Sequence, residues 1–307
     1  MTTSTLSAAT ALSERDQPDA AAAARARRSR QRRRLRNLPV HIAMALLGLA
    51  WVYPLLWALT SSFKTKMDMF GDGPSVLIRS MPQFRNYIDA WTQANFGQYF
   101  FNSVVITVLT VFFTVLFTSM AGYALARTRF PGRKVIMVVV AITMFLPRGY
   151  TLIPVFDLVY QLYLLNTIWA VVVVQVAGGM IFSTFLFMGY FMSANKELEE
   201  AARVDGAGFN RTFVHVMLPT ARPMIATVGL FSFIGSWNDF IIPLVFTLGR
   251  PELRTIPVGV AALTGGSAGT DWPVLCAASV MALLPIVIVF VIAQKHIINA
   301  FAGAVKG

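Results

Sequence analysis

Long apolar runs alternate along the chain with short polar segments. After a polar stretch of 38 residues come six apolar runs, each close to the ~20 residues that a helix needs to cross the ~30 Å hydrocarbon core of a bilayer. They are Pro39–Ser61, Tyr99–Ala126, Val135–Phe156, Thr167–Tyr190, Pro223–Leu248 and Trp272–Gln294. Pro147 and Pro154 predict a break within the third run. The pattern therefore predicts an all-α integral membrane protein with six transmembrane helices in a domain spanning residues 39–294.

The composition agrees with a bilayer as the solvent. Hydrophobic residues make up 56% of the chain and charged residues 13%, whereas a soluble domain carries roughly 25% charged residues. A soluble enzyme, a disordered regulator and a secreted disulfide scaffold are therefore excluded. Half of the net charge of +12 lies in the first 38 residues, which hold nine basic and three acidic side chains. We interpret this Arg-rich segment as a disordered cytoplasmic tail facing anionic lipid, and not as a nucleic-acid-binding arm.

The distribution of basic residues predicts the orientation. With a cytoplasmic N-terminus, the inner segments are residues 1–38, 127–134, 191–222 and 295–307, and they carry nine, four, four and two basic residues, or 19 of the 26 Lys and Arg side chains. Basic residues accumulate in cytoplasmic loops. We therefore expect both termini in the cytoplasm and a multi-pass protein of a bacterial plasma membrane. The outer segment 62–98 has Gly, Pro and mixed charges, which are typical of an irregular loop.

The inner loop 191–222 is the most informative segment between two spans. Asn195 or Ser193 is suited to begin a helix, and the acidic residues after them favour its first turn. Gly206 is suited to end that helix, and a second short helix is expected from about Phe209 to Met217, ended by Pro219. The prediction is a helix–turn–helix elbow on the cytoplasmic face. Two of its small residues, Ala201 and Ala202, would allow a partner to approach closely.

This elbow resembles the "EAA" loop of permease subunits of ABC importers. The resemblance depends on Glu-Ala-Ala, Asp-Gly-Ala and a distal Leu-Pro at fixed spacing, namely Glu200, Ala201, Ala202, Asp205, Gly206, Ala207, Leu218 and Pro219. Val216 is a conservative departure, since the family usually has Ile there. Further segments are similar to the carbohydrate branch, in particular the six-span maltose-transporter type: Gly122–Arg133, Ile153–Phe156, Ser236–Phe240, Thr255–Gly259 and Ala302–Gly307. The similarity is nearly continuous from Pro39 to Gly307.

The resemblance implies a type I ABC importer permease fold and a transport function. The chain would be one of two homologous permeases that form the path for a sugar or oligosaccharide. Its partners would be that second permease, a dimer of ATPase subunits, an extracellular solute-binding protein and membrane lipid. In the family, the loop docks into the ATPase and couples ATP-driven motion to alternating access. The chain itself would bind no cofactor, because ATP belongs to the partner, and it would not be an enzyme.

The resemblance also implies a role for the last residues. In the maltose type, the C-terminal tail reaches into the ATPase dimer, which assigns such a contact to Gly303, Lys306 and Gly307. Read without the resemblance, residues 295–307 are a short flexible end.

Polar groups inside the spans are candidates for the translocation path. Asp239 and Arg148 lie at similar depth toward the outer leaflet, and an intramembrane charge is a functional hypothesis by default. They would brace an outer gate as a pair, or each would reach the headgroup region separately. Trp237 and Asn238 would either line a sugar path or pack within the bundle.

Signals for other functions are weak. No phosphate-binding loop of the Gly-x-x-x-x-Gly-Lys-[Ser/Thr] type occurs in the sequence, and no His/Cys spacing fits a metal site. The alternatives are an ABC importer permease for another small solute, an ion-coupled secondary transporter, and an integral membrane enzyme. A secondary transporter would show inverted repeats and paired intramembrane carboxylates, and an enzyme would need a catalytic cluster.

Overall fold

The computed structural model describes residues 37–71, 76–93, 95–145, 151–264 and 269–304. It divides into two units, Met1–Trp57 and Ala58–Gly307. The Arg-rich tail lies almost wholly outside the described residues. What is described of the first unit belongs to the helix Asn37–Ser61, which has a mean hydropathy of 2.0 and side chains that are largely exposed. This helix confirms the first predicted span.

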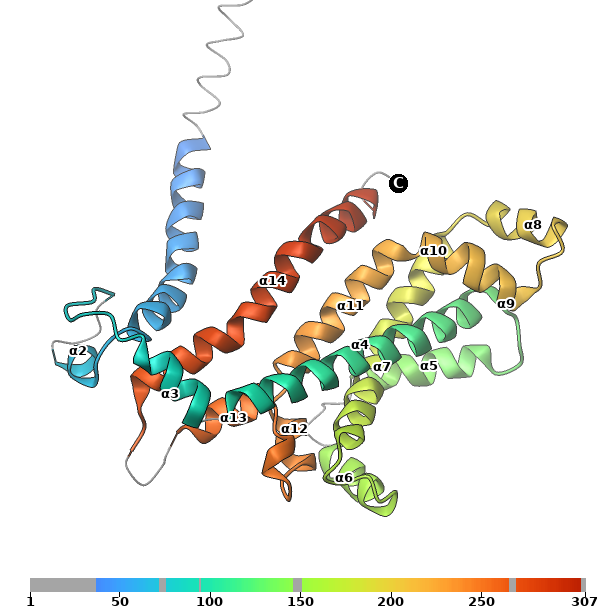
Figure 1. Cartoon of the computed structure of the whole chain (residues 1–307). Coiled ribbons are helices and arrows are strands. Elements are labelled where there is room, and N and C mark those ends of the chain that lie inside the picture. Colours follow the sequence, from blue (N-terminus) through green and yellow to red (C-terminus); the bar gives the residue numbers. More distant parts are fainter. Residues whose placement is uncertain (1–36, 72–75, 94, 146–150, 265–268, 305–307) are drawn as a thin grey trace, which may run out of the picture. The chain divides into compact units, whose positions relative to one another are not determined.

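Three further long apolar helices occur in the second unit (Figure 1): α4 (Phe96–Arg127), α7 (Ile168–Ser193) and α14 (Trp272–Ala304). Each is long and apolar enough to cross a membrane, and they confirm the second, fourth and sixth predicted spans. The backbone of α14 continues past Gln294 as a helix, so the segment predicted as a short flexible end begins as a helical extension.

The remaining two predicted spans are divided. In place of Val135–Phe156 the structure has α5 (Arg133–Thr143) and α6 (Leu152–Gln161), and in place of Pro223–Leu248 it has α11 (Arg222–Trp237) and α12 (Ile241–Phe246). The division of the third run agrees with the break that its prolines predict, whereas the prediction of a single helix over Pro223–Leu248 is wrong. At α12, the Asp239 carboxylate accepts a hydrogen bond from the Ile242 N–H at 3.2 Å, which begins a new helix. The all-helical membrane fold itself is confirmed.

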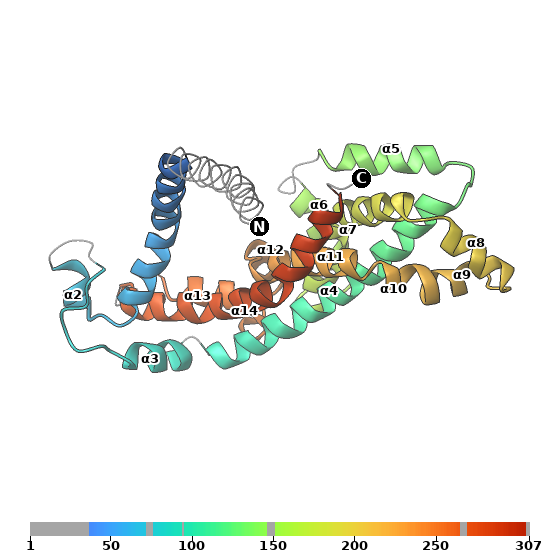
Figure 2. The same ribbon diagram turned by 90° about the horizontal axis from the view of Figure 1, so that it is seen from above.

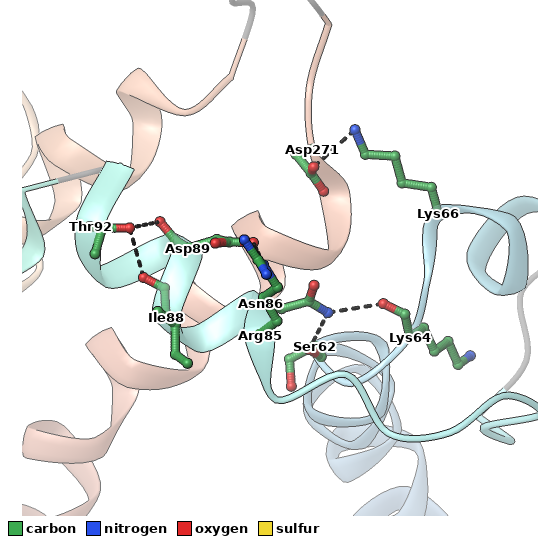
Figure 3. Close-up of polar contacts among 9 residues, drawn as sticks. All are labelled: Ser62, Lys64, Lys66, Arg85, Asn86, Ile88, Asp89, Thr92 and Asp271. Atoms are coloured by element: carbon green, nitrogen blue, oxygen red, sulfur yellow. Dashed lines mark hydrogen bonds and ion pairs between the residues drawn. The ribbon is translucent and has the colours of Figure 1, made fainter.

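The segment predicted as an irregular outer loop contains two helices, α2 (Lys66–Phe70) and α3 (Arg85–Gln93). Figure 3 shows what holds them. The side-chain amide of Asn86 donates to the carbonyl oxygens of Ser62 and Lys64 at 2.8 and 2.9 Å. Lys66 pairs with Asp271, just before α14, at 2.9 Å. The segment between α12 and α14 contains a 3₁₀ turn, Pro251–Leu253, and α13 (Ile256–Ala262).

Helices α4 and α7 form the centre of the second unit and lie side by side in both views (Figures 1 and 2). Small and hydroxyl residues allow close approach of membrane helices, and a Cβ on Gly122 would lie only 2.6 Å from the Phe187 Cβ. One face of α4 is a buried polar stripe made of Asn102, Ser103, Thr107, Thr110, Thr114, Thr118 and Ser119. The stripe meets several neighbours of α4: Thr110 contacts Gln175 on α7, Thr107 contacts Ser236 on α11, and Ser103 accepts a hydrogen bond from the Ile256 N–H.

Candidate functional site

The elbow predicted from the sequence is present as a chain of short helices between α7 and α11. It consists of α8 (Glu197–Val204), α9 (Phe209–Thr212), a π-helical turn (Phe213–Met217) and α10 (Leu218–Thr220). Of these elements, α8 lies furthest out, beyond the ends of α4 and α7, in Figures 1 and 2. The order of elements matches the prediction, whereas the details of the second half differ.

Helix α8 begins and ends as its residues favour. The Asn195 side chain accepts a hydrogen bond from the Glu197 N–H at 3.0 Å, and three glutamates occupy the first turn, where the helix dipole favours negative charge. At the end, Gly206 adopts a φ of +80°, a conformation that costs other residues free energy. The Ala207 N–H then returns to the Ala202 carbonyl at 2.9 Å. This is the Schellman closure that satisfies the last carbonyls of a helix.

The exposure of the side chains on α8 differs from the prediction at one residue, Ala202. Glu199 and Ala202 are buried within the chain, at 6% and 8% exposure. Glu200 and Ala201 face outward, as do Asp205 and Gly206, while Ala207 is half-buried. Of the two alanines expected to admit a partner, only Ala201 is therefore free to do so, since Ala202 is used for internal packing.

The second half of the elbow extends slightly further than the sequence predicts and ends in a bend that the sequence does not predict. Pro219 lies inside α10 and does not end the helix. The chain turns by 77° between Phe209–Thr220 and Arg222–Trp237, at Ala221. A proline ring inside a helix clashes with the carbonyl four residues earlier. Here the wider π turn immediately before it, closed by the Leu218 N–H on the Phe213 carbonyl, accommodates the ring.

Aromatic packing fixes the elbow to the ends of α4 and α7. The ring of Tyr123 on α4 lies 4.8 Å from Phe209 and 5.0 Å from Phe213, centroid to centroid, and 5.3 Å from Phe191 at the end of α7. Tyr123 and Phe191 are buried at 2% and 0% exposure. The elbow therefore rests on a packed aromatic core and not on a flexible linker.

A buried ion pair makes a second connection between the elbow and α4. The Arg127 Nε lies 2.7 Å from a Glu199 carboxylate oxygen, and the two side chains are only 6% and 8% exposed. The N–H is not aimed at that oxygen, so the contact is an ion pair and not an aligned hydrogen bond. A second guanidinium nitrogen of Arg127 donates to the Ala194 carbonyl at 2.7 Å. One side chain thus binds both the start of the elbow and the buried acid of α8.

Sequence reasoning missed this pair. Arg127 was counted only as a basic residue of an inner loop, and Glu199 only as one of three acids in a helical turn. One signal for the burial of Glu199 was available in the sequence. Glu199 precedes Ala202 by three residues, so these two residues lie on the same face of the helix, whereas Glu200 does not share that spacing.

At the far end of α11, the three residues proposed for the path have different surroundings. Trp237 is 3% exposed, stacks on Phe233 at 5.7 Å and donates its indole N–H to the Ala282 carbonyl at 3.1 Å. It packs within the bundle, the second of the two alternatives. Asn238 is exposed and donates to the Ile234 carbonyl at 2.9 Å. Arg148 lies outside the described residues.

Asp239 belongs to a polar junction that the sequence did not predict. Its carboxylate accepts a hydrogen bond from the Gln175 amide nitrogen on α7 at 3.0 Å. The amide oxygen of Gln175 accepts hydrogen bonds from the hydroxyls of Ser236 and Thr110, at 2.7 and 3.0 Å. Gln175 therefore joins α4, α7 and the α11–α12 break at one point. We call Gln175, Asp239, Ser236 and Thr110 the polar junction.

Of the residues assigned to the C-terminal contact, Gly303 lies in the helical extension of α14, and Lys306 and Gly307 lie outside the described residues. Among the residues that the structure describes, no group of three His, Cys, Asp or Glu side chains is placed to hold a metal ion.

Comparison with known proteins identifies the family. Residues 119–302, which include the elbow and α11 through most of α14, match the model described as "Binding-protein-dependent transport system inner membrane component". The chain belongs to this family. Membership places it among multi-pass permeases of the ABC transporter type and not among enzymes.

Relatives and solved structures cover most of the chain. It is 35% identical over 269 residues to a probable ABC transporter permease protein, YurM, of Bacillus subtilis, covering 87% of this chain and 88% of the relative. It is 34% identical to the diacetylchitobiose uptake system permease protein NgcG of Streptomyces coelicolor, covering 87% and 86%. A bacterial ABC transporter involved in the import of the acidic polysaccharide alginate matches with a TM-score of 0.74 and 25% identity, over 85% of this chain and 96% of that one.

Proposed function

We propose that this chain is a permease subunit of an ATP-driven importer for a sugar or oligosaccharide. The observation that carries the cargo class is the agreement among its relatives. Those named for a substrate include transport permeases for diacetylchitobiose, arabinooligosaccharides and galactooligosaccharides, at 29–34% identity over most of the chain. A solute-binding protein, a second permease and an ATPase dimer are the partners, and both termini lie in the cytoplasm.

The elbow is the site at which the ATPase acts on this subunit. The exposed residues Glu200, Ala201, Asp205 and Gly206 form the docking surface, with Ala207 at its edge. Ala202 supports that surface from inside, and Leu218 with Pro219 shapes the turn that leads into α11. The terminal residues Gly303, Lys306 and Gly307 make a second contact with the ATPase.

The packing of the elbow supports this mechanism, because a force applied to α8 has two rigid routes into the membrane domain. The first runs through Glu199 and Arg127 into α4. The second runs through the buried side chains Phe213 and Met217 and the bend at Ala221 into α11. Closure of the ATPases on ATP then moves both helices together, and the path alternates between outward and inward access. In this proposal, Asn238 and Asp239 lie on that path.

Retention of the ATPase during purification tests the docking surface. Glu200→Lys reverses an exposed charge of α8, and we expect the purified permeases to lose most of the co-purifying ATPase. Asp157→Lys, which reverses an exposed charge on α6, is the matched control and should retain it. Unchanged retention with Glu200→Lys would refute the docking surface.

Uptake of labelled sugars tests the cargo. Cells that contain the whole importer should accumulate at least one mono- or oligosaccharide of a panel, and cells that lack this chain should not. Uptake of amino acids or peptides in place of sugars, with the ATPase still bound, would refute the cargo class but not the permease assignment.

A further inference from the structure

A basic cavity lies beside the elbow, between the ends of α4 and α7 and the starts of α5 and α8. Its volume is about 380 Å³, within the size range of small-molecule sites. Five basic side chains line it, Arg127, Arg129, Arg133, Lys196 and Arg203, against two carboxylates, Glu199 and Glu200. We call it the basic cavity.

The charges of the basic cavity do not cancel internally. Glu199 is neutralised by Arg127 at 2.7 Å, which leaves four basic groups against Glu200. The Nε of Arg133 is buried and has no hydrogen-bond partner among the described residues. A buried donor without a partner costs free energy unless a ligand or water satisfies it. Helix α5 also begins here, with no acidic side chain in its first turn, so its dipole adds positive potential.

The position of the cavity indicates the source of the anion. Ala126 and Met192, at the ends of two membrane-spanning helices, line it together with the basic groups. Helix α5 leads away from it with no buried residue. Its apolar side chains Val135, Val138 and Ile142 are each more than half exposed. A charged cavity that continues into an exposed apolar helix matches a molecule with an anionic head and hydrocarbon tails.

We propose that the basic cavity binds the phosphate headgroup of an anionic phospholipid, with the acyl chains lying along α5. Basic pockets between membrane helices on the cytoplasmic side are suited to such headgroups. The proposal rests on the proposed function only for the cytoplasmic placement of the elbow. A lipid held at Arg133 and Arg203 would join α5 to α8 and so stabilise the elbow in its docked position.

Lipid binding to the purified, delipidated importer tests the proposal. The probes are phosphatidylglycerol, zwitterionic phosphatidylcholine and inorganic phosphate, and the readouts are bound lipid by native mass spectrometry and the shift in Tm. We expect saturable binding of phosphatidylglycerol that weakens with added salt, and no comparable Tm shift with the other two probes. An equal shift with phosphatidylcholine would overturn the headgroup recognition, and an equal shift with phosphate would make the ligand a soluble anion.

Variants of two separate walls locate the site. Arg129→Gln with Arg133→Gln, and independently Lys196→Gln with Arg203→Gln, should each weaken phosphatidylglycerol binding about 25-fold, or about five-fold per charge removed. The matched control is Arg211→Gln with Arg222→Gln. It removes two exposed charges near the elbow that lie outside the cavity, and the affinity for phosphatidylglycerol should change less than two-fold.

Two results would overturn the assignment of the cavity. One is an affinity for phosphatidylglycerol that falls equally in the control variant. The other is an unchanged affinity in both wall variants; if the co-purifying ATPase is lost at the same time, the cavity receives an acidic segment of the ATPase. Failure of the proposed function would appear separately, in sugar uptake and in ATPase retention by Glu200→Lys, neither of which is a lipid measurement.

Discussion

Helix α11 begins at a bend and ends at a break, and these two interruptions are held in place by different physical means. At its start, the 77° bend at Ala221 is held mainly by packing: Met217 and Ala221 are fully buried, and the Tyr190 hydroxyl satisfies the Thr220 carbonyl at 2.6 Å. At its end, the break before α12 is held by side-chain hydrogen bonds centred on Gln175. A packed apolar core resists small displacements, whereas hydrogen bonds among side chains can exchange partners.

This difference suits the two ends to different tasks in the proposed transport cycle. The elbow end has to transmit a force from the ATPase without yielding, which close packing and a buried ion pair allow. The end at the polar junction has to change its conformation when the path opens, which exchangeable side-chain hydrogen bonds allow. Substitutions of buried side chains at the elbow end should therefore cost much stability, and substitutions at the polar junction should cost less stability but alter transport.

The largest effect is expected at the buried ion pair. Arg127→Met leaves the Glu199 carboxylate buried without its partner, and we expect a loss of about 3–5 kcal/mol in the free energy of unfolding. The double variant with Glu199→Met should recover most of it. Denaturant unfolding in detergent measures both, with exposed Arg211→Met as control. A double variant as unstable as the single one would show that the charge is not the cause.

Removal of an aromatic anchor should come next. Phe213→Ala empties the space against Tyr123, and we expect a cost of about 3 kcal/mol together with loss of ATPase retention. Val214, the next residue, is 50% exposed, so Val214→Ala is the matched control and should cost less than about 0.5 kcal/mol. If Phe213→Ala and Val214→Ala lose equal amounts of stability, the aromatic packing does not account for the stability of the elbow.

A smaller effect on stability is expected at the polar junction. Gln175→Leu removes three side-chain hydrogen bonds, which in membrane proteins average about 0.6 kcal/mol each, so we expect a loss of about 2 kcal/mol. ATPase retention should be unchanged, while the rate of sugar uptake should fall several-fold. If sugar uptake is unimpaired while stability falls by the same amount, the polar junction contributes to stability and not to transport.

The smallest effect concerns the turn after α8. Gly206→Ala forces a side chain into a φ of +80°, at a cost of about 1–2 kcal/mol. Gly208→Ala, two residues further on at a φ of −72° and with open space around its Cα, should be neutral. Hydrogen exchange of the α8 amides reports the difference locally. Equal exchange rates in the two alanine variants would mean that the turn does not depend on glycine.

Both the correct and the wrong predictions from the sequence follow from the range of the forces involved. Apolar runs such as Thr167–Tyr190 predicted their helices to within a few residues, because hydropathy acts over a whole span. The start of α8 and its end at Gly206 were also predicted correctly, because capping and backbone preference are local. The second short helix was predicted to end at Pro219 but continues to Thr220, because a π turn upstream allows the proline to remain inside the helix.

The sequence by itself determined the membrane class, the helical architecture, the permease family and the position of the elbow, since each depends on composition or on short motifs. Tertiary structure alone decided which face of α8 is available, since Ala202 is buried and Ala201 exposed only once α8 packs against the π-helical turn Phe213–Met217. It also brought Arg127 to Glu199, and Gln175 to Asp239, across 72 and 64 residues of chain. Contacts between residues so distant in sequence depend on how the helices pack, which no local pattern encodes.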